Sequence, residues 1–130
     1  MAAAKPPAPK AQKLVLVVDD DTAIREMVVK ALATRYRVES ASDGLAASEM
    51  LGSLRPDLLI CDVMMPRVDG FSLARMIRSH PELAQMPIIF LTAKNSPQAM
   101  VQGIQLGARH YVQKPFSVKE LLEKVVKLLP

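Results

Sequence analysis

Leu14-Val-Leu-Val-Val-Asp-Asp-Asp21 is the stretch that decides the fold, because five consecutive apolar residues are followed at once by three acids. A short apolar run of this kind is typical of a strand buried on both faces, as in a parallel sheet. Asp62, Thr92 and Lys114 also follow short apolar runs. The carboxyl ends of parallel strands share one sheet edge, where ligands bind in open α/β folds. We therefore expect these polar side chains to meet at one site.

The rest of the chain alternates between apolar, β-branched segments and helical patterns. The expected strands are residues 14–18, 36–41, 58–61, 87–91 and 110–113, and the expected helices are residues 22–34, 44–53, 70–79, 97–106 and 117–129. Strands that alternate with helices of this length indicate βαβ units, a parallel sheet and right-handed crossovers. The sequence therefore predicts an α/β fold with helices on both faces of the sheet.

Local signals mark several of the expected helix ends. Ser96-Pro97 is typical of an N-cap followed by proline at the first helical position, and Ser117-Val-Lys-Glu120 is typical of a capping box. Asp43-Gly44 indicates a turn into the second helix, and Gly107 suits a left-handed residue after the fourth.

Composition limits the domain organisation and the class of protein. The 130 residues suffice for one domain, and we expect a flexible Ala/Pro/Lys-rich arm over residues 1–12 and the folded domain over 13–130. Three lysines near the N-terminus account for most of the net charge of +4, and aromatic residues are few. These features argue against direct nucleic-acid binding by the domain. We expect no membrane segment and, from the single Cys61, a reducing cytoplasmic location.

The polar residues at the strand ends suit phosphoryl chemistry. Asp19, Asp20 and Asp62 would repel one another without a cation among them, and Mg²⁺ prefers such oxygen ligands. Thr92 and Lys114 could contact phosphoryl oxygens, while Asp62 as nucleophile would form an aspartyl phosphate. Taken alone, the acids after the first strand are better explained as a helix N-cap beside the helix dipole.

Four motifs together resemble the receiver domain of a two-component response regulator, similar to the chemotaxis regulator. The motifs are Val-Val-Asp19-Asp20-Asp21, Cys61-Asp62-Val-Met-Met-Pro66-Arg-Val-Asp-Gly70, Leu91-Thr92-Ala93 and Lys114-Pro115-Phe116, and the resemblance covers residues 13–129. The resemblance implies a flavodoxin-like (βα)5 fold, a doubly wound five-stranded parallel sheet of order 2-1-3-4-5. It also implies a signalling phospho-acceptor that catalyses only its own phosphorylation and dephosphorylation.

The resemblance assigns a role to each site residue. Asp62 matches the phospho-acceptor, Asp20 a direct Mg²⁺ ligand, and Asp19 a ligand through water. The backbone carbonyl of Met64 matches the third protein ligand of the metal. Thr92 and Lys114 match the switch hydroxyl and the phosphate-binding lysine. The Lys114-Pro115 bond matches a cis peptide, and Tyr111 matches an aromatic switch residue.

The resemblance also implies partners and a kinetic role for two further residues. A sensor histidine kinase or phosphotransfer protein would supply the phosphoryl group. The face formed by the last two helices and the last strand, roughly residues 97–129, would pass the signal to a downstream effector or a fused output domain. A phosphorylation-dependent dimer is also possible. Met64 and Lys94 flank the path of the hydrolytic water in this family, so we expect both to set the aspartyl-phosphate lifetime.

Two alternatives compete with this interpretation. A haloacid-dehalogenase-like phosphohydrolase would use Asp19 as nucleophile and Asp21 as acid/base, but Ala23 stands where a hydroxyl residue is expected. A pseudo-receiver that binds partners without phosphate would usually lack an acid or the lysine, and this chain keeps them all. A flavodoxin is poorly supported, because the loop after the first strand is acidic and has no phosphate cradle.

Overall fold

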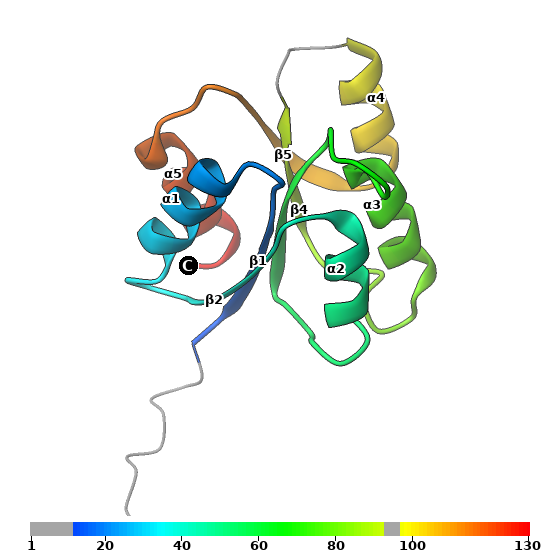
Figure 1. Ribbon diagram of the computed structural model, residues 1–130, viewed down its shortest axis with the longest axis horizontal. Helices are drawn as coiled ribbons and strands as arrows, with labels where there is room; N and C mark the ends of the chain where they lie inside the picture. Colours follow the sequence, from blue (N-terminus) through cyan, green and yellow to red (C-terminus); the bar gives the residue numbers. More distant parts are fainter. Residues whose placement is uncertain (1–11, 93–96) are drawn as a thin grey trace, which may run out of the picture.

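The computed structural model describes residues 12–92 and 97–130. They form a five-stranded parallel sheet with helices on both faces (Figure 1). The predicted arm therefore lies outside the described residues except for its last one, and so do Lys94 and Ser96.

Strands and helices alternate strictly along the chain, as the sequence pattern predicts. The elements are β1 (Leu14–Val18), α1 (Thr22–Leu32), β2 (Arg37–Ala41), α2 (Gly44–Met50), β3 (Leu58–Asp62), α3 (Gly70–Ser79), β4 (Ile88–Thr92), α4 (Pro97–Gln105), β5 (Ala108–Gln113) and α5 (Val118–Leu128). All neighbouring strands pair in parallel, in the order β2-β1-β3-β4-β5. This is the predicted doubly wound order.

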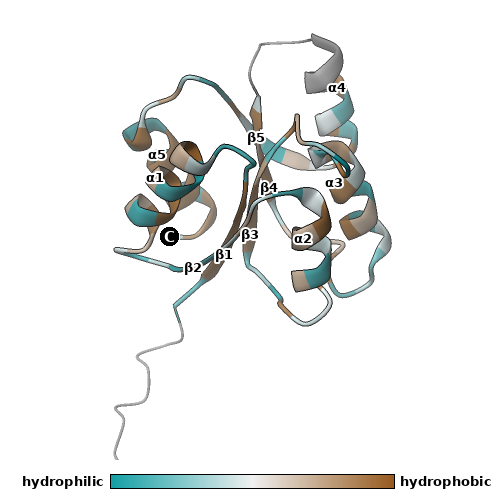
Figure 2. Ribbon diagram, in the orientation of Figure 1, coloured by the Kyte–Doolittle hydropathy of each residue, from teal (hydrophilic) through white to brown (hydrophobic). Residues whose placement is uncertain are grey.

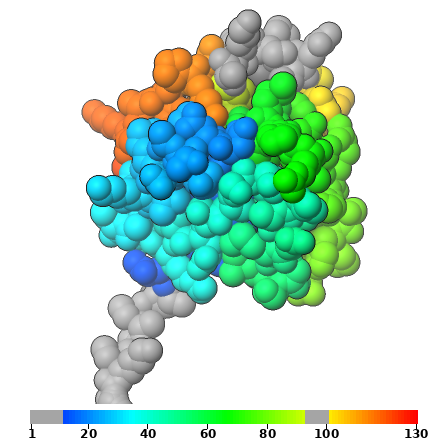
Figure 3. All heavy atoms as spheres, in the orientation of Figure 1, coloured from blue at the N-terminus to red at the C-terminus, as the bar shows by residue number. Residues whose placement is uncertain are grey.

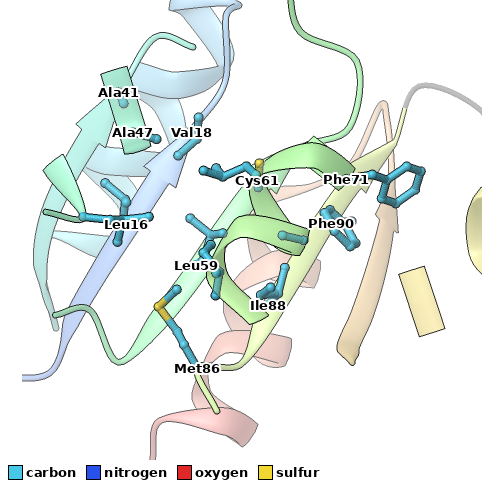
Figure 4. Packing of buried hydrophobic residues seen from close by; sticks show 14 of the residues in the cluster. Leu16, Val18, Ala41, Ala47, Leu59, Cys61, Phe71, Met86, Ile88 and Phe90 are labelled. Carbon is cyan, nitrogen blue, oxygen red and sulfur yellow. The ribbon is translucent and has the colours of Figure 1, made fainter. Parts of the chain in front are cut away.

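The sheet separates two hydrophobic cores. One lies under α2 and α3 and contains the residues labelled in Figure 4, with Phe90 packed edge-on against Phe71 at 5.0 Å between ring centroids. The other lies under α1 and α5, where Leu121 and Val125 of α5 are buried. Figure 2 shows the apolar sides of the helices turned towards the sheet. β1, β3 and β4 are fully buried because both of their faces are covered.

The helix caps confirm most of the local signals. The side chains of Asp21, Asp43 and Ser117 accept hydrogen bonds from backbone N–H groups at the starts of α1, α2 and α5. Gly107 has φ +78°, the left-handed conformation expected after α4. Asp21 is therefore the N-cap of α1, as the N-cap interpretation of the acids predicted.

Several element boundaries differ from the predicted ones. α1 ends at Leu32 and α2 at Met50, each before the predicted end, because the chain turns there. β5 begins at Ala108, two residues earlier than expected, and pairs with Ile88 of β4 next to a register irregularity. That irregularity disturbs the strand alternation on which the prediction depended. No helix within residues 12–92 and 97–130 is long and apolar enough to cross a membrane.

Candidate functional site

Three acids meet at the carboxyl edge of the sheet. Asp19 and Asp20 follow β1 and Asp62 ends β3, and one carboxylate oxygen of each lies within 4.8 Å of the others. Asp19 is fully buried, Asp62 is 4% exposed, and Asp20 faces solvent. Figure 3 shows the start of α1 and the segment that follows β3 lying against each other on the surface above this edge. The strand pattern therefore placed these acids together correctly.

Lys114 lies between the two buried carboxylates. Its Nζ is 3.0 Å from Asp19 Oδ2 and 3.4 Å from Asp62 Oδ2. The ammonium therefore contacts both carboxylates, and the shorter contact is the one with Asp19. The Lys114–Pro115 peptide bond is cis, as the resemblance implied. The backbone N–H of Lys114 donates to the carbonyl of Thr92 at 2.6 Å, which fixes the lysine at the end of β5.

This arrangement shifts the pKa of both partners. Burial and the neighbouring Asp19 carboxylate together raise the pKa of Asp62 to about 6, although Lys114 opposes both effects. Burial alone would lower the pKa of Lys114, but its contacts with Asp19 and Asp62 outweigh burial and raise it. The single positive charge of Lys114 therefore does not balance the negative charges of the clustered carboxylates.

The buried acid has the properties of a cation ligand. Oδ1 of Asp19 accepts a hydrogen bond from the Asp21 N–H at 2.9 Å, whereas Oδ2 accepts none and has only the ion pair with Lys114. A buried carboxylate oxygen without a hydrogen bond is costly unless a cation compensates it. With the exposed Asp20 and the nearby Asp62, the donor set is hard, anionic and open to solvent on one side, which fits a divalent cation such as Mg²⁺.

The loop between β3 and α3 is held close to the acceptor candidate. A Cβ on Gly70 would collide with the carbonyl oxygen of Asp62, so the loop can return this closely only with glycine there. Asp69 caps α3 by accepting from the Ser72 N–H at 2.7 Å. The side chain of Asp69 is exposed, so it caps the helix while it stays in contact with solvent. The Asp-Gly pair before α2 gave the same signal and could have revealed this cap.

Thr92 and Tyr111, the two residues with predicted switch roles, lie in the neighbouring strands β4 and β5. Thr92 ends β4 at the same edge and is 7% exposed. Tyr111 lies in the middle of β5, half-buried, with its ring 5.8 Å from that of Phe90. Its hydroxyl fills the space that a Cβ on Gly103 of α4 would need. Because α4 has a glycine there, the tyrosine ring can lie against the helix.

Met64 extends into solvent beside the acids. Its side chain is 71% exposed, the largest exposure given for any large hydrophobic residue in the described part of the chain. The predicted roles of its backbone carbonyl and its side chain stay predictions. Lys94, the other residue expected to affect the hydrolytic water, lies outside the described residues.

Comparison with known proteins identifies the family. The model of the family described as "Response regulator receiver domain" matches residues 15–126. The chain belongs to this family. Response regulator MprA of Mycobacterium ulcerans is 47% identical over 116 residues, which cover 88% of this chain and 49% of that protein. MprA of Mycobacterium avium is 46% identical over the same length, with 50% of that protein covered.

Solved structures support the same assignment of the receiver domain. Chemotaxis protein CheY4 of Vibrio cholerae superposes with a TM-score of 0.86 at 35% identity, covering 91% of this chain and 99% of that one. The receiver domain of the Francisella response regulator 1452 gives 0.81 at 32% identity, with 89% and 95% covered. This receiver domain spans about half the length of the two MprA relatives. The phosphohydrolase and pseudo-receiver alternatives are not favoured by these relationships.

Proposed function

We propose that Asp62 accepts a phosphoryl group and that its aspartyl phosphate switches the signalling surface of this receiver domain. The observation that carries the proposal is the position of Lys114, whose ammonium lies within 3.4 Å of Asp62 at the edge of a three-acid cluster. A nucleophilic carboxylate, a metal-ligating set and a cation for the equatorial oxygens are the parts that phosphoryl transfer needs. Lys114 lies still closer to Asp19, at 3.0 Å, so the choice of Asp62 over Asp19 as the acceptor follows the family motif.

The donor would be a phosphohistidine on a sensor histidine kinase or a phosphotransfer protein, as family membership implies. An Asp62 carboxylate oxygen attacks phosphorus, the O–P bond forms as the P–N bond breaks, and the imidazole nitrogen takes the electron pair and then a proton. The carboxylate must be ionised to attack, and its pKa of about 6 leaves it mostly ionised at neutral pH. Lys114 would then pair with a phosphoryl oxygen.

Asp19, Asp20, Asp62 and the backbone carbonyl of Met64 would hold Mg²⁺ in this proposal, Asp20 directly and Asp19 through water. Bound there, the ion would neutralise the acids and the charge that develops on the transferring phosphoryl group. Asp19 Oδ2, which accepts no hydrogen bond and has only the Lys114 ion pair, and the exposure of Asp20 support this assignment. We expect the full chain to need the cation for phosphorylation, so that a chelator suppresses labelling reversibly.

A labelling experiment tests the acceptor. The full chain is incubated with acetyl phosphate and Mg²⁺, and the phosphorylated fraction is measured on a phosphate-affinity gel and by mass spectrometry. Asp62→Asn should abolish labelling, whereas Asp21→Asn should keep it, because asparagine also caps a helix well. Labelling that survives in Asp62→Asn but disappears in Asp19→Asn would instead identify Asp19 as the nucleophile.

The switch itself rests on contacts that exist only with the phosphoryl group present. Thr92 and Lys114 can supply such contacts, and only differential contacts shift a conformational equilibrium. We expect Thr92→Ala to be phosphorylated normally while its output no longer depends on phosphate. Output would pass through the α4–β5–α5 face to an effector or a fused output domain. Fully phosphate-dependent partner binding by Thr92→Ala would contradict this mechanism.

A further inference from the structure

A half-buried cation, Arg78 of α3, has only backbone carbonyls as its hydrogen-bond partners. Nη1 donates to the carbonyls of Ala84 at 2.9 Å and Met86 at 2.7 Å, and Nε donates to that of Leu106 at 2.6 Å. Nη2 donates to the carbonyl of Gly107 at 3.2 Å. An arginine has five N–H donors, so one N–H of Nη2 is left for another acceptor. The carbonyls fix the guanidinium in place, but they do not neutralise its charge.

A β-bulge in β5 places a second cation, Arg109, beside Arg78. The residues on either side of Arg109 pair with consecutive residues of β4, so Arg109 is an extra residue without a partner in that strand. Bulges are rare in parallel sheets, and they turn a side chain out of the regular alternation. Burial lowers the pKa of Arg78, and the positive charge of Arg109 lowers it further, so the two cations are close enough to repel each other. Both stay charged at neutral pH.

No acid of the described residues neutralises this arginine pair. The ion pairs within residues 12–92 and 97–130 join other groups, and neither Arg78 nor Arg109 takes part in one. Glu82, the acid nearest to Arg78 in the sequence, pairs with Arg55 at 3.3 Å. Glu123 is an exposed acid on α5, and it forms no ion pair with Arg109. Two like charges held together cost free energy, and a bound anion would remove that cost.

Both arginines line one cavity of about 240 Å³. The cavity lies where β4 and β5 begin, at the opposite end of the sheet from Asp62. Gln85 and Gly107 also line it, and both are exposed, so it is open to solvent. A water molecule occupies about 30 Å³ in the liquid, so the cavity has room for a phosphoryl group with a small substituent.

The charges of the cavity favour a phosphate dianion over other anions. Guanidinium groups match both carboxylates and phosphates in geometry. A carboxylate carries one negative charge, whereas a phosphate monoester carries about 1.5 to 2 at neutral pH, which balances two arginines. Nucleic acid needs many more phosphate contacts than two arginines supply. A bilayer also fits poorly, because none of the exposed large hydrophobic side chains in the described part of the chain lines the cavity.

We propose that Arg78 and Arg109 bind inorganic phosphate or a small soluble phosphate monoester in this cavity, with the side-chain amide of Gln85 beside them. Arg109 supplies a guanidinium with all its donors free, and Arg78 supplies its charge and one N–H. Since Arg78 binds carbonyls just before β4 and β5, a ligand on it would stabilise the starts of both strands. The proposal does not rest on phosphorylation of Asp62, which lies at the other edge of the sheet.

Inorganic phosphate is the probe, added to the isotopically labelled full chain in a metal-free buffer without other phosphate or carboxylate. Backbone amide shifts are followed by NMR. The amides of Gln85, Gly107 and Arg109 should shift together and saturate, with a Kd at or below about 1 mM. Sulfate should compete, because it is also a tetrahedral dianion. Acetate should bind at least about tenfold more weakly, because it carries one charge.

Variants of exposed arginines test the assignment without removing the carbonyl contacts of Arg78. Arg109→Glu should abolish saturable binding, and Arg109→Lys should lower the affinity about tenfold, because lysine keeps the charge but lacks the planar fork. The matched control Arg75→Glu reverses an exposed charge on α3 outside the cavity and should change the affinity by less than about threefold. Circular dichroism should show all three variants folded, because the altered side chains are exposed.

Four outcomes would overturn the proposal. Shifts that do not saturate, or that respond equally to Arg75→Glu and Arg109→Glu, would indicate an adventitious ion only. Saturable shifts confined to the amides of Thr92 and Lys114 would place phosphate at the other sheet edge. Acetate that binds as tightly as phosphate would make the ligand a carboxylate. Sedimentation with phosphatidic acid vesicles through Arg109, without any response to inorganic phosphate, would make it a lipid headgroup.

Failure of this proposal is distinguishable from failure of the proposed function. The titration contains neither a metal ion nor a phosphoryl donor, so Asp62 stays unphosphorylated throughout. A chain that is not labelled at Asp62 should therefore still bind phosphate at Arg109, and a chain that does not bind it there should still be labelled at Asp62.

Discussion

Replacing Asp62 by Asn should stabilise the protein when divalent cations are removed. Burial and the neighbouring Asp19 raise the pKa of Asp62 to about 6, against about 3.9 for a free aspartate. Each pKa unit corresponds to about 1.4 kcal/mol, so ionised Asp62 lowers the free energy of unfolding by about 3 kcal/mol at neutral pH. The pKa of about 6 already includes the opposing effect of Lys114, and asparagine has no charge to desolvate. We therefore expect a net gain of about 1 to 3 kcal/mol, or several degrees in Tm.

The pH dependence gives this prediction its sign. Because the carboxyl pKa is raised by folding, the cost of Asp62 is complete above about pH 6 and disappears as the pH falls towards the unfolded value near 4. The stability difference between Asp62→Asn and the natural protein should therefore shrink across this interval. Mg²⁺ should stabilise the natural protein more than the variant, since one of the proposed ligands is lost.

Urea unfolding followed by circular dichroism, in a chelator at pH 7.5 and at pH 4.5, measures the effect. The control Glu26→Gln removes a negative charge from the exposed side of α1 and should change stability by less than about 0.5 kcal/mol at both pH values. Equal or lower stability of Asp62→Asn at pH 7.5 would refute the reasoning. A gain that stays constant down to pH 4.5 would refute it as well.

Three further changes probe other parts of the site. Gly103→Ala should displace the Tyr111 ring, because the tyrosine hydroxyl fills the space that the new methyl group needs. Burial raises the pKa of Tyr111, so spectrophotometric titration in a Tyr36→Phe background should show a lower pKa after the change. An unchanged pKa would contradict the packing. Met64→Gln should alter the aspartyl-phosphate half-life several-fold, measured by loss of label, while stability stays within about 0.5 kcal/mol; unchanged decay would reject the role of Met64. In Lys114→Met, the lysine that competes with the metal for buried Asp19 at 3.0 Å is lost, so the affinity for Mg²⁺, measured by calorimetry, should rise about tenfold. A lower affinity would show that the lysine does not compete with the metal.

The sequence predicts the fold well where burial is complete on both faces of a strand. β1, β3 and β4 come from apolar runs; β3 and β4 end in the polar residues Asp62 and Thr92, and Asp19 follows β1 directly. β5 is only partly buried, and Ala108 and Arg109 give no apolar signal, so its start was missed. Edge strands carry a weaker pattern because only one neighbour and part of one face constrain them.

The candidate site was predictable in its members but not in its distances. An apolar run followed by Asp or Lys shows that the polar side chain lies at the carboxyl end of a strand. In a parallel sheet all these ends lie at the same edge. The run does not show that Lys114 lies nearer to Asp19 than to Asp62, because this depends on the rotamers of three side chains and on the cis bond that follows the lysine. The caps at Asp43 and Asp69 show the same limit: identical Asp-Gly pairs precede α2 and α3, yet only the first was recognised.

The closer contact of Lys114 with Asp19 gives the lysine two successive partners. Before phosphorylation, its charge compensates a buried carboxylate whose Oδ2 has no hydrogen bond. A divalent cation among the acids would supply that compensation instead, and the pairing with Asp19 would lose much of its value. A phosphoryl group on Asp62 would then add about 1.5 to 2 negative charges on the other side of the ammonium. The lysine would move from Asp19 towards the phosphoryl oxygens, and its backbone bond to Thr92 would couple that movement to the end of β4. This movement of the lysine needs both the metal and the phosphoryl group. Either one alone should therefore produce only part of the active conformation.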